Sequence, residues 1–167
     1  LGLHSVQADE LAAGSPAPKF TLLDQESKTH TLTEYRGRWV VLYFYPKDDT
    51  PGCTTEACNF RDDLPAMRAL NVQILGISID DTKSHARFAE KYSLPFPLLA
   101  DTEGDVARAY GSLWSIGPMR IAKRYTFVID PDGRIARIYR NVKPASHSRE
   151  LQHDLKELQK GPAGARK

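Results

Sequence analysis

The pattern of apolar positions along the chain predicts buried strands separated by helices. Three short runs, 39–45, 72–79 and 126–130, are rich in β-branched, aliphatic and aromatic residues. Runs of this length and continuity are typical of strands buried on both faces of a sheet that helices cover. The turn at 130–133 leads into another apolar run at 134–140, and this combination predicts a β-hairpin.

Helical spacing fills the gaps between these runs. After Pro51, apolar residues recur at Phe60, Leu64 and Met67, which lie on one face of a helix. Pro65 should kink or split that helix, because proline cannot donate the backbone hydrogen bond that a helix interior requires. The same criteria predict three further helices, at 81–92, 105–110 and 146–158.

The order β-α-β-α-β-β-α predicts an α/β domain with a central mixed sheet flanked by helices. The 167 residues fit a single domain. We assign that domain to 12–160, with a flexible N-terminal extension at 1–11 and a C-terminal tail at 161–167. The stretch 19–37 is expected to form two short strands joined by a turn.

Composition and charge exclude several classes of protein. The chain is 41% hydrophobic and 26% charged, with a formal net charge of +2, which argues against disorder and coiled coil. No block of lysine and arginine suggests a nucleic acid or an anionic lipid as partner. No apolar run approaches the ~18 residues that a membrane-spanning helix needs.

The first ten residues raise the question of export. They begin with leucine, and they place Val6 and Ala8 in the spacing of small residues that a signal peptidase recognises. We therefore expect the tail of an export leader and a periplasmic location. The alternative is a cytoplasmic protein with an N-terminal extension or a cloning boundary.

Cys53 and Cys58 are the two cysteines of the chain, and they follow the run 39–45. Thr50 is expected to cap the next helix, with Pro51 in the first helical position. Cys53 then lies third, among backbone N–H groups that have no partner within the helix. These donors and the positive end of the helix dipole favour a thiolate. Cys53 is thus a candidate reactive cysteine, and the alternative is a small buried apolar residue.

The spacing of the two cysteines constrains how they can react with each other. Residues five apart on an ideal helix lie ~140° and ~8.7 Å apart at Cα, whereas a disulfide requires at most ~7 Å. We therefore expect an intact helix through Cys53 and Cys58 in the reduced protein. In a disulfide form, the helix should be broken between Thr50 and roughly Phe60.

Other uses of paired cysteines fit the sequence less well. A metal site would need two more ligands, and a cysteine protease would need a histidine near a strand end. Neither zinc-like spacing nor such a position is evident among the five histidines, which are His4, His30, His85, His147 and His153. The Cys-x-x-Cys motif of thioredoxin-type reductases is absent.

The stretch FYPKDDTPGCTTEAC, residues 44–58, resembles the peroxiredoxins, and among them the PrxQ group, also called bacterioferritin comigratory protein. The group's pattern Pro-x-x-x-Thr-x-x-Cys is matched by Pro46, Thr50 and Cys53, and Cys58 follows five residues later. The stretches GSPAPKFTLLDQ, FPLLAD and KRYTFVIDPDGRI are also similar to the family, so the resemblance covers essentially 12–160. It implies a thioredoxin-like fold.

The resemblance implies a role for each matching residue. Cys53 corresponds to the peroxidatic cysteine and Cys58 to the resolving cysteine. Thr50 corresponds to the residue whose hydroxyl bonds the thiolate and the peroxide, and Pro46 to the residue that shields the thiolate from water. The same correspondence makes Arg124 the residue that orients the peroxide and stabilises the thiolate.

Glu56 matches an acidic position near the site, with either a supporting role or that of an ordinary first-turn acid. The implied activity is reduction of hydrogen peroxide and organic hydroperoxides, with thioredoxin or a glutaredoxin-like dithiol protein as the reductant. No metal, haem or flavin is needed, and an intrachain resolving cysteine suits a monomer. The segment 112–123 is expected to form a loop or short strand near the site.

Two alternatives to a peroxidase remain on the sequence alone. One is a redox sensor or thiol–disulfide exchange protein without significant peroxidase turnover, and the other is a non-catalytic binding module.

Overall fold

The computed structural model describes residues 11–161. Nearly all of the predicted N-terminal extension and C-terminal tail lies outside this range, as does the predicted leader remnant. Within the described range, no helix has both the length and the apolar character needed to cross a membrane.

The described chain contains nine strands, seven of which form one sheet. The strands are β1 (Thr21–Leu23), β2 (Thr29–Thr31), β3 (Trp39–Phe44), β4 (Val72–Ser78), β5 (Leu98–Ala100), β6 (Leu113–Ile116), β7 (Met119–Ala122), β8 (Thr126–Ile129) and β9 (Ile135–Tyr139). The order in the large sheet is β2-β1-β5-β4-β3-β8-β9. Strands β3, β4 and β5 are parallel, whereas β8 pairs with β3 antiparallel. The predicted central mixed sheet is therefore confirmed.

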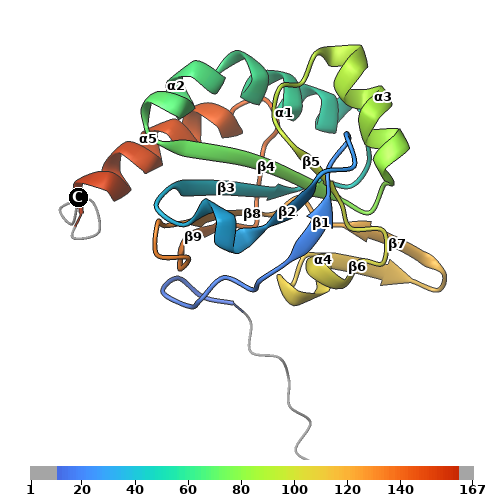
Figure 1. The fold of residues 1–167 in the computed structure, drawn as a ribbon, viewed down its shortest axis with the longest axis horizontal. Helices are drawn as coiled ribbons and strands as arrows, with labels where there is room; N and C mark the ends of the chain where they lie inside the picture. Colours follow the sequence, from blue (N-terminus) through green and yellow to red (C-terminus); the bar gives the residue numbers. More distant parts are fainter. Residues whose placement is uncertain (1–10, 162–167) are drawn as a thin grey trace, which may run out of the picture.

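Five α-helices and one 3₁₀ helix pack on this sheet. They are η1 (Leu32–Tyr35), α1 (Pro51–Asp62), α2 (Leu64–Ala69), α3 (Thr82–Tyr92), α4 (Asp105–Ala109) and α5 (His147–Lys160). Helices α1, α2, α3 and α5 cover one face, and α4 lies on the other (Figure 1). The helix predicted after Pro51 is split into α1 and α2 next to Pro65, as expected.

Strand β3 divides the core into two layers. All six of its residues are buried. Val41 and Tyr43 face the layer under α1 and α5, and the alternate residues Val40, Leu42 and Phe44 face the layer of η1 and α4. A continuous apolar run is thus explained by burial on both faces, and the loop after β3 is carried on a rigid central strand.

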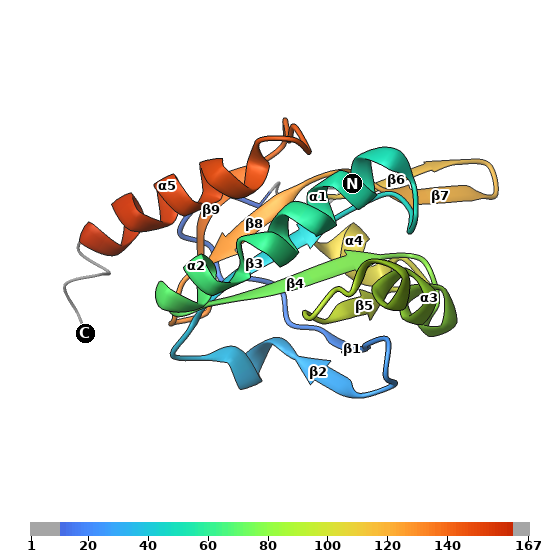
Figure 2. The ribbon, with the colours of Figure 1, turned by 90° about the horizontal axis from the view of Figure 1, so that it is seen from above.

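Two features differ from the predicted order of elements. Strand β5 is an additional parallel strand beside β4, in a three-residue run that is too short to show a period. The segment 112–123, expected to be a loop or short strand, forms the separate β6–β7 hairpin. The hairpin projects beyond the sheet (Figure 2).

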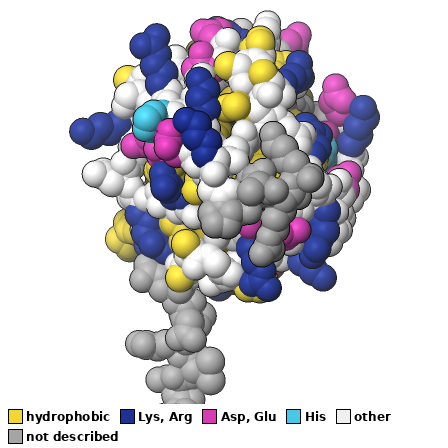
Figure 3. Space-filling model, turned by 90° about the vertical axis from the view of Figure 1, so that its left-hand side faces the viewer, with side chains coloured by type: hydrophobic (Ala, Val, Ile, Leu, Met, Phe, Trp, Pro, Cys, Tyr) yellow, Lys and Arg dark blue, Asp and Glu magenta, His cyan; other side chains and the backbone are white. Residues whose placement is uncertain are grey.

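Surface charges of both signs are interspersed. On the face at the carboxyl end of α5, lysine and arginine side chains alternate with aspartate and glutamate (Figure 3). This mixture agrees with the small formal net charge of +2, and it gives no sign of a single-sign field on that face.

Candidate active site

Cys53 is the third residue of α1. Thr50 occupies the N-cap position with extended dihedral angles (φ −98°, ψ 156°), and Pro51 occupies the first helical position, as predicted. The first helical hydrogen bond runs from the Thr54 N–H to the Thr50 carbonyl at 2.8 Å. Cys53 is only 1% exposed. The sulfur therefore lies at the positive end of α1, among backbone N–H groups of the first turn.

Arg124 brings a cation to this sulfur from the segment between β7 and β8. Its Nη2 donates to Sγ of Cys53 at 3.3 Å, and its Nη1 donates to Oε1 of Glu56 at 3.1 Å. The Glu56 side chain is 1% exposed, whereas that of Arg124 is 20% exposed. The guanidinium thus bridges the thiol and a buried carboxylate on the same helix, one turn apart.

The electrostatics of this group follow from burial and pairing. Burial raises the pKa of Glu56 to about 7, and Arg124 offsets only part of that rise. Burial alone would lower the pKa of Arg124, because it disfavours the cation. Cys53 and Glu56 together raise this pKa by more than burial lowers it, so the pKa of Arg124 is raised. The guanidinium is therefore always charged, while the carboxyl of Glu56 titrates near neutrality.

Gly52 allows the guanidinium to come this close to α1. A Cβ atom at this position would lie 3.1 Å from Nη2 of Arg124 and 3.6 Å from Cγ of Pro144. The first distance is shorter than ordinary van der Waals contact, so a Cβ atom here would require the guanidinium to shift by a few tenths of an ångström.

Thr50 is oriented differently from the expectation. Its hydroxyl donates to the carbonyl of Lys47 at 2.8 Å, and it makes no side-chain cap on α1. A hydroxyl has one proton, and here that proton is directed to Lys47 and not to the sulfur. The first turn of α1 therefore has no side-chain cap from Thr50. Pro46 lies two residues beyond the end of β3 and is partly buried.

Both cysteines are free thiols, and Cys58 is partly buried. Helix α1 is continuous from Pro51 to Asp62 and contains both residues. The prediction of an intact helix through the reduced pair is confirmed. Arg61, one turn further on, donates to the Tyr92 carbonyl at 2.6 Å.

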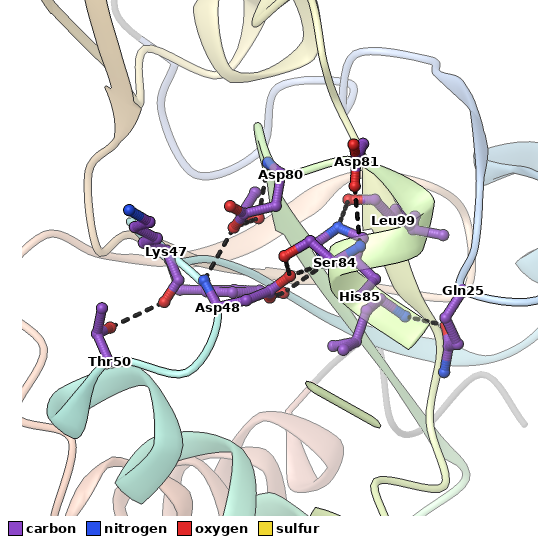
Figure 4. A network of polar contacts seen from close by, with 12 residues as sticks. Gln25, Lys47, Asp48, Thr50, Asp80, Asp81, Ser84, His85 and Leu99 are labelled. Atoms are coloured by element: carbon purple, nitrogen blue, oxygen red, sulfur yellow. Dashed lines mark hydrogen bonds and ion pairs between the residues drawn. The ribbon is translucent and has the colours of Figure 1, made fainter. Parts of the chain in front are cut away.

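The loop between β3 and α1 is held by a buried network that the sequence analysis missed (Figure 4). Asp48 accepts from the Tyr45 hydroxyl at 2.6 Å and from the Ser84 hydroxyl at 2.8 Å. Nδ1 of His85 lies 2.7 Å from the same carboxylate. The Asp48 N–H donates to Asp80 at 2.9 Å. The network fastens the loop that carries Thr50 to α3 and to the end of β4.

Asp48, Asp80 and His85 also meet the geometric requirement for a cation site, because their ligand atoms lie within 4.8 Å of one another. Each of the three, however, is paired with protein groups, and the second ring nitrogen of His85 lies 3.1 Å from the Leu99 carbonyl. We interpret the cluster as a structural anchor of the loop.

Helix α1 is also fastened from the side of α5. The Asn59 side chain donates to the carbonyls of Pro144 and Ala145, both at 3.3 Å. The ring of Phe60 packs edge-on against His147, with centroids 6.1 Å apart. These contacts hold the second and third turns of α1, the part that contains Cys58.

The β6–β7 hairpin leads directly to Arg124 and exposes apolar side chains. Trp114 is 36% exposed, Ile116 63% and Met119 62%. In a chain whose other large apolar residues are mostly buried, such exposure marks a surface suited to contact with apolar molecules.

Residues 13–138 match the AhpC/TSA family. The chain is 41% identical over 151 residues to peroxiredoxin Bcp of Bacillus subtilis (strain 168), which covers 87% of this chain and 95% of that protein. It is 42% identical over 154 residues to the chloroplastic peroxiredoxin Q of Gentiana triflora, which covers 90% of this chain and 68% of that protein.

Solved structures give the same result. Peroxidoxin BcpB from Mycobacterium tuberculosis aligns with a TM-score of 0.83 at 33% identity, over 88% of this chain and 97% of that chain. A mutant of PrxQ from Xylella fastidiosa aligns with a TM-score of 0.83 at 34% identity, over 88% of this chain and 96% of that chain.

Proposed function

The chain belongs to the AhpC/TSA family and is a thiol-dependent peroxidase of the peroxiredoxin Q group, and we propose that Cys53 is its peroxidatic cysteine and Cys58 its resolving cysteine. The observation that carries this assignment is the 3.3 Å contact from Nη2 of Arg124 to Sγ of Cys53. This contact supports Cys53 as the peroxidatic cysteine, because a cation and the amino end of a helix both stabilise a thiolate. The thiolate is the nucleophilic form of cysteine.

In the proposed first step, the Cys53 thiolate attacks the nearer oxygen of the peroxide. The S–O bond forms as the O–O bond breaks, and the sulfur is oxidised to a sulfenic acid. The departing oxygen takes up a proton and leaves as water or an alcohol. Negative charge spreads over sulfur and both oxygens, where Arg124 and the first-turn N–H groups of α1 are already in place.

Thr50 and Pro46 are proposed to position the peroxide and exclude water. Because the Thr50 hydroxyl directs its proton to Lys47, its oxygen is oriented to accept a hydrogen bond from the peroxide O–H. Pro46, in the loop after β3, would cover the sulfur with an apolar ring. Glu56 would keep Arg124 aimed at the sulfur through the ion pair at 3.1 Å.

Resolution is proposed to follow within the same chain. Cys58 attacks the sulfenic sulfur of Cys53, a disulfide forms and water leaves. Since residues five apart on an intact helix lie ~8.7 Å apart at Cα and a disulfide needs at most ~7 Å, the first turns of α1 must unwind. The contacts of Asn59 with Pro144 and Ala145 would then break.

A dithiol protein completes the cycle by reducing the disulfide, and thioredoxin or a glutaredoxin-like protein is the proposed donor. Because both cysteines lie on α1, one chain suffices and we propose a monomer. The exposed apolar residues of the β6–β7 hairpin support organic hydroperoxides as substrates beside hydrogen peroxide.

The test is peroxide consumption with a thioredoxin system by the wild type, Cys53→Ser and Cys58→Ser. Cys53→Ser should abolish consumption. Cys58→Ser should consume one peroxide per chain and then stop with Cys53 as a sulfenic or over-oxidised acid. Intact turnover by Cys53→Ser would overturn the first assignment, and normal multiple turnover by Cys58→Ser with thioredoxin alone would overturn the second.

A further inference from the structure

Two buried oxygen atoms near the active site have no hydrogen-bond partner. Among the described residues 11–161, the buried side-chain polar atoms without a partner are the Tyr43 hydroxyl and Oε2 of Glu56. Both residues are no more than 1% exposed. Burying such groups unpaired is costly, and proteins rarely leave them so.

Glu56 lies on α1, and the Tyr43 ring packs on Phe60, one turn further along that helix, with ring centroids 4.7 Å apart. Burial raises the pKa of Tyr43 well above its usual value, and Glu56 adds to that rise. A Cβ atom on Gly76 would lie 2.9 Å from Cζ of this ring and 3.0 Å from its hydroxyl. The hydroxyl is thus held in a fixed place.

The partners that each atom requires are complementary. Tyr43 retains its proton throughout the neutral range, so its hydroxyl is a donor in search of an acceptor. Oε1 of Glu56 is already paired with Arg124 at 3.1 Å, whereas Oε2 is an acceptor in search of a donor.

We propose that Tyr43 is a positioning residue whose hydroxyl donates to Oε2 of Glu56 through one buried water. Its effect is to favour the carboxylate form of Glu56 over the protonated form. The carboxylate in turn holds Arg124 against the sulfur of Cys53. This inference rests on the proposed role of Cys53 and adds a residue that never touches the peroxide.

A hydrogen-bond donor to Glu56 has a large effect on its charge because the pKa of this group lies near neutral pH. Burial brings the pKa of Glu56 to about 7, so a single hydrogen bond decides whether the group is charged at neutral pH. Other ionisable groups also act on Tyr43 or Arg124. They are Cys53 on α1, Tyr45 and Asp48 after β3, and His147 on α5. Burial lowers the pKa of His147, so that ring adds no cation near Arg124 at neutral pH.

The first experiment measures the rate of Cys53 oxidation by hydrogen peroxide against pH. Tyr43→Phe removes one oxygen and keeps the packed ring. Losing a hydrogen bond to a charged group should move the acid limb of the profile upward by about one pH unit, with the rate well above the limb unchanged. Tyr110→Phe is the matched control, because this buried hydroxyl donates to the Pro18 carbonyl in the other core layer. It should leave the limb in place.

A second experiment follows the Glu56 carboxyl itself by infrared spectroscopy in Cys53→Ser protein, where no peroxide chemistry is required. Tyr43→Phe should raise the pH at which the protonated carboxyl band disappears, and Glu56→Gln should abolish that band. An unmoved limb and an unmoved band in Tyr43→Phe would make Tyr43 a packing residue only and overturn the proposal. If Tyr43→Phe moved the band while Cys53→Ser still consumed peroxide at the wild-type rate, the proposed function would be overturned and the role of Tyr43 would stand.

Discussion

The guanidinium of Arg124 passes so close to Gly52 that a Cβ atom there would lie 3.1 Å from Nη2. Glycine is not required by the backbone at this point, since Gly52 is the second residue of α1 and alanine favours helices by about 1 kcal/mol over glycine. The glycine therefore serves the approach of Arg124 to Cys53.

Gly52→Ala should separate stability from activity. We expect unchanged or slightly higher stability, because alanine suits the helix. We expect the rate of Cys53 oxidation to fall about tenfold or more, because a displaced Arg124 stabilises the transition state less well. Stopped-flow peroxide kinetics and urea unfolding measure the two quantities.

Gly161→Ala is the control for this substitution. Gly161 follows α5 with φ −74°, and an added Cβ would meet the Leu158 carbonyl at 3.4 Å. It should leave the peroxide rate unchanged. Equal rates for Gly52→Ala and the wild type would show that Arg124 does not need this gap.

Glu56 should make the protein less stable as the pH rises. Its pKa in the folded chain is about 7, against an ordinary value of 4.5 for glutamate. Between these values the unfolded chain has released the proton while the folded chain still holds it, so the free energy of unfolding decreases with pH. The full difference is on the order of 3 kcal/mol.

Urea unfolding from about pH 5 to pH 8 tests this effect in the wild type and in Glu56→Gln. The variant should lack the decline, so its stability relative to the wild type should increase with pH. Glu157→Gln, an exposed residue on α5, should reproduce the wild-type profile. A parallel decline in Glu56→Gln would rule out Glu56 as its source.

The anchor of the catalytic loop is expected to depend on Asp48. Asparagine at this position has one side-chain oxygen instead of two. It can therefore no longer accept hydrogen bonds from Tyr45, Ser84 and His85 together. Leaving buried donors unpaired should cost about 3 kcal/mol, and the loosened loop should slow peroxide reduction.

Thermal and urea unfolding measure the first effect of Asp48→Asn, and peroxide kinetics measure the second. Asp105→Asn, whose ion pair with Arg108 is exposed, should change stability by less than about 1 kcal/mol. A similarly small change in Asp48→Asn would mean that the loop is held by other contacts.

The sequence predicted those features of the site that local signals determine. The continuous apolar run of β3 indicated a strand buried on both faces, and Pro51 marked the start of α1. Pro65 marked the end of that helix correctly, because the loss of a backbone donor acts within one turn. Cys53 was therefore placed correctly from its neighbours alone.

The remaining features depend on residues that are distant in the sequence. Arg124 was identified by resemblance to a family, and no local pattern leads to it. The contact of His85 with Asp48 spans 37 positions, and His85 looks like an ordinary helix residue in the sequence. The side chain of Thr50 turned to Lys47 instead of capping α1, a choice between two local partners that the sequence does not decide.

Asn59 should slow the unwinding of α1 that the disulfide requires. Its side chain donates to the carbonyls of Pro144 and Ala145, both at 3.3 Å, and these bonds exist only while the helix is intact. Asn59→Ala removes about 1 kcal/mol of this restraint. Disulfide formation after one equivalent of peroxide should therefore be about fivefold faster. At high peroxide, less Cys53 should reach the sulfinic acid, because resolution competes with over-oxidation.

Rapid acid quenching and mass spectrometry measure both quantities in the same samples. Thr55→Ala is the matched control, because Thr55 is an exposed residue on the same helix, and its replacement by alanine also raises helix propensity. It should leave resolution unchanged or slow it slightly. If Asn59→Ala resolved no faster than Thr55→Ala, the restraint on α1 would have to come from its apolar contacts, with Phe60 against His147 as the next to test.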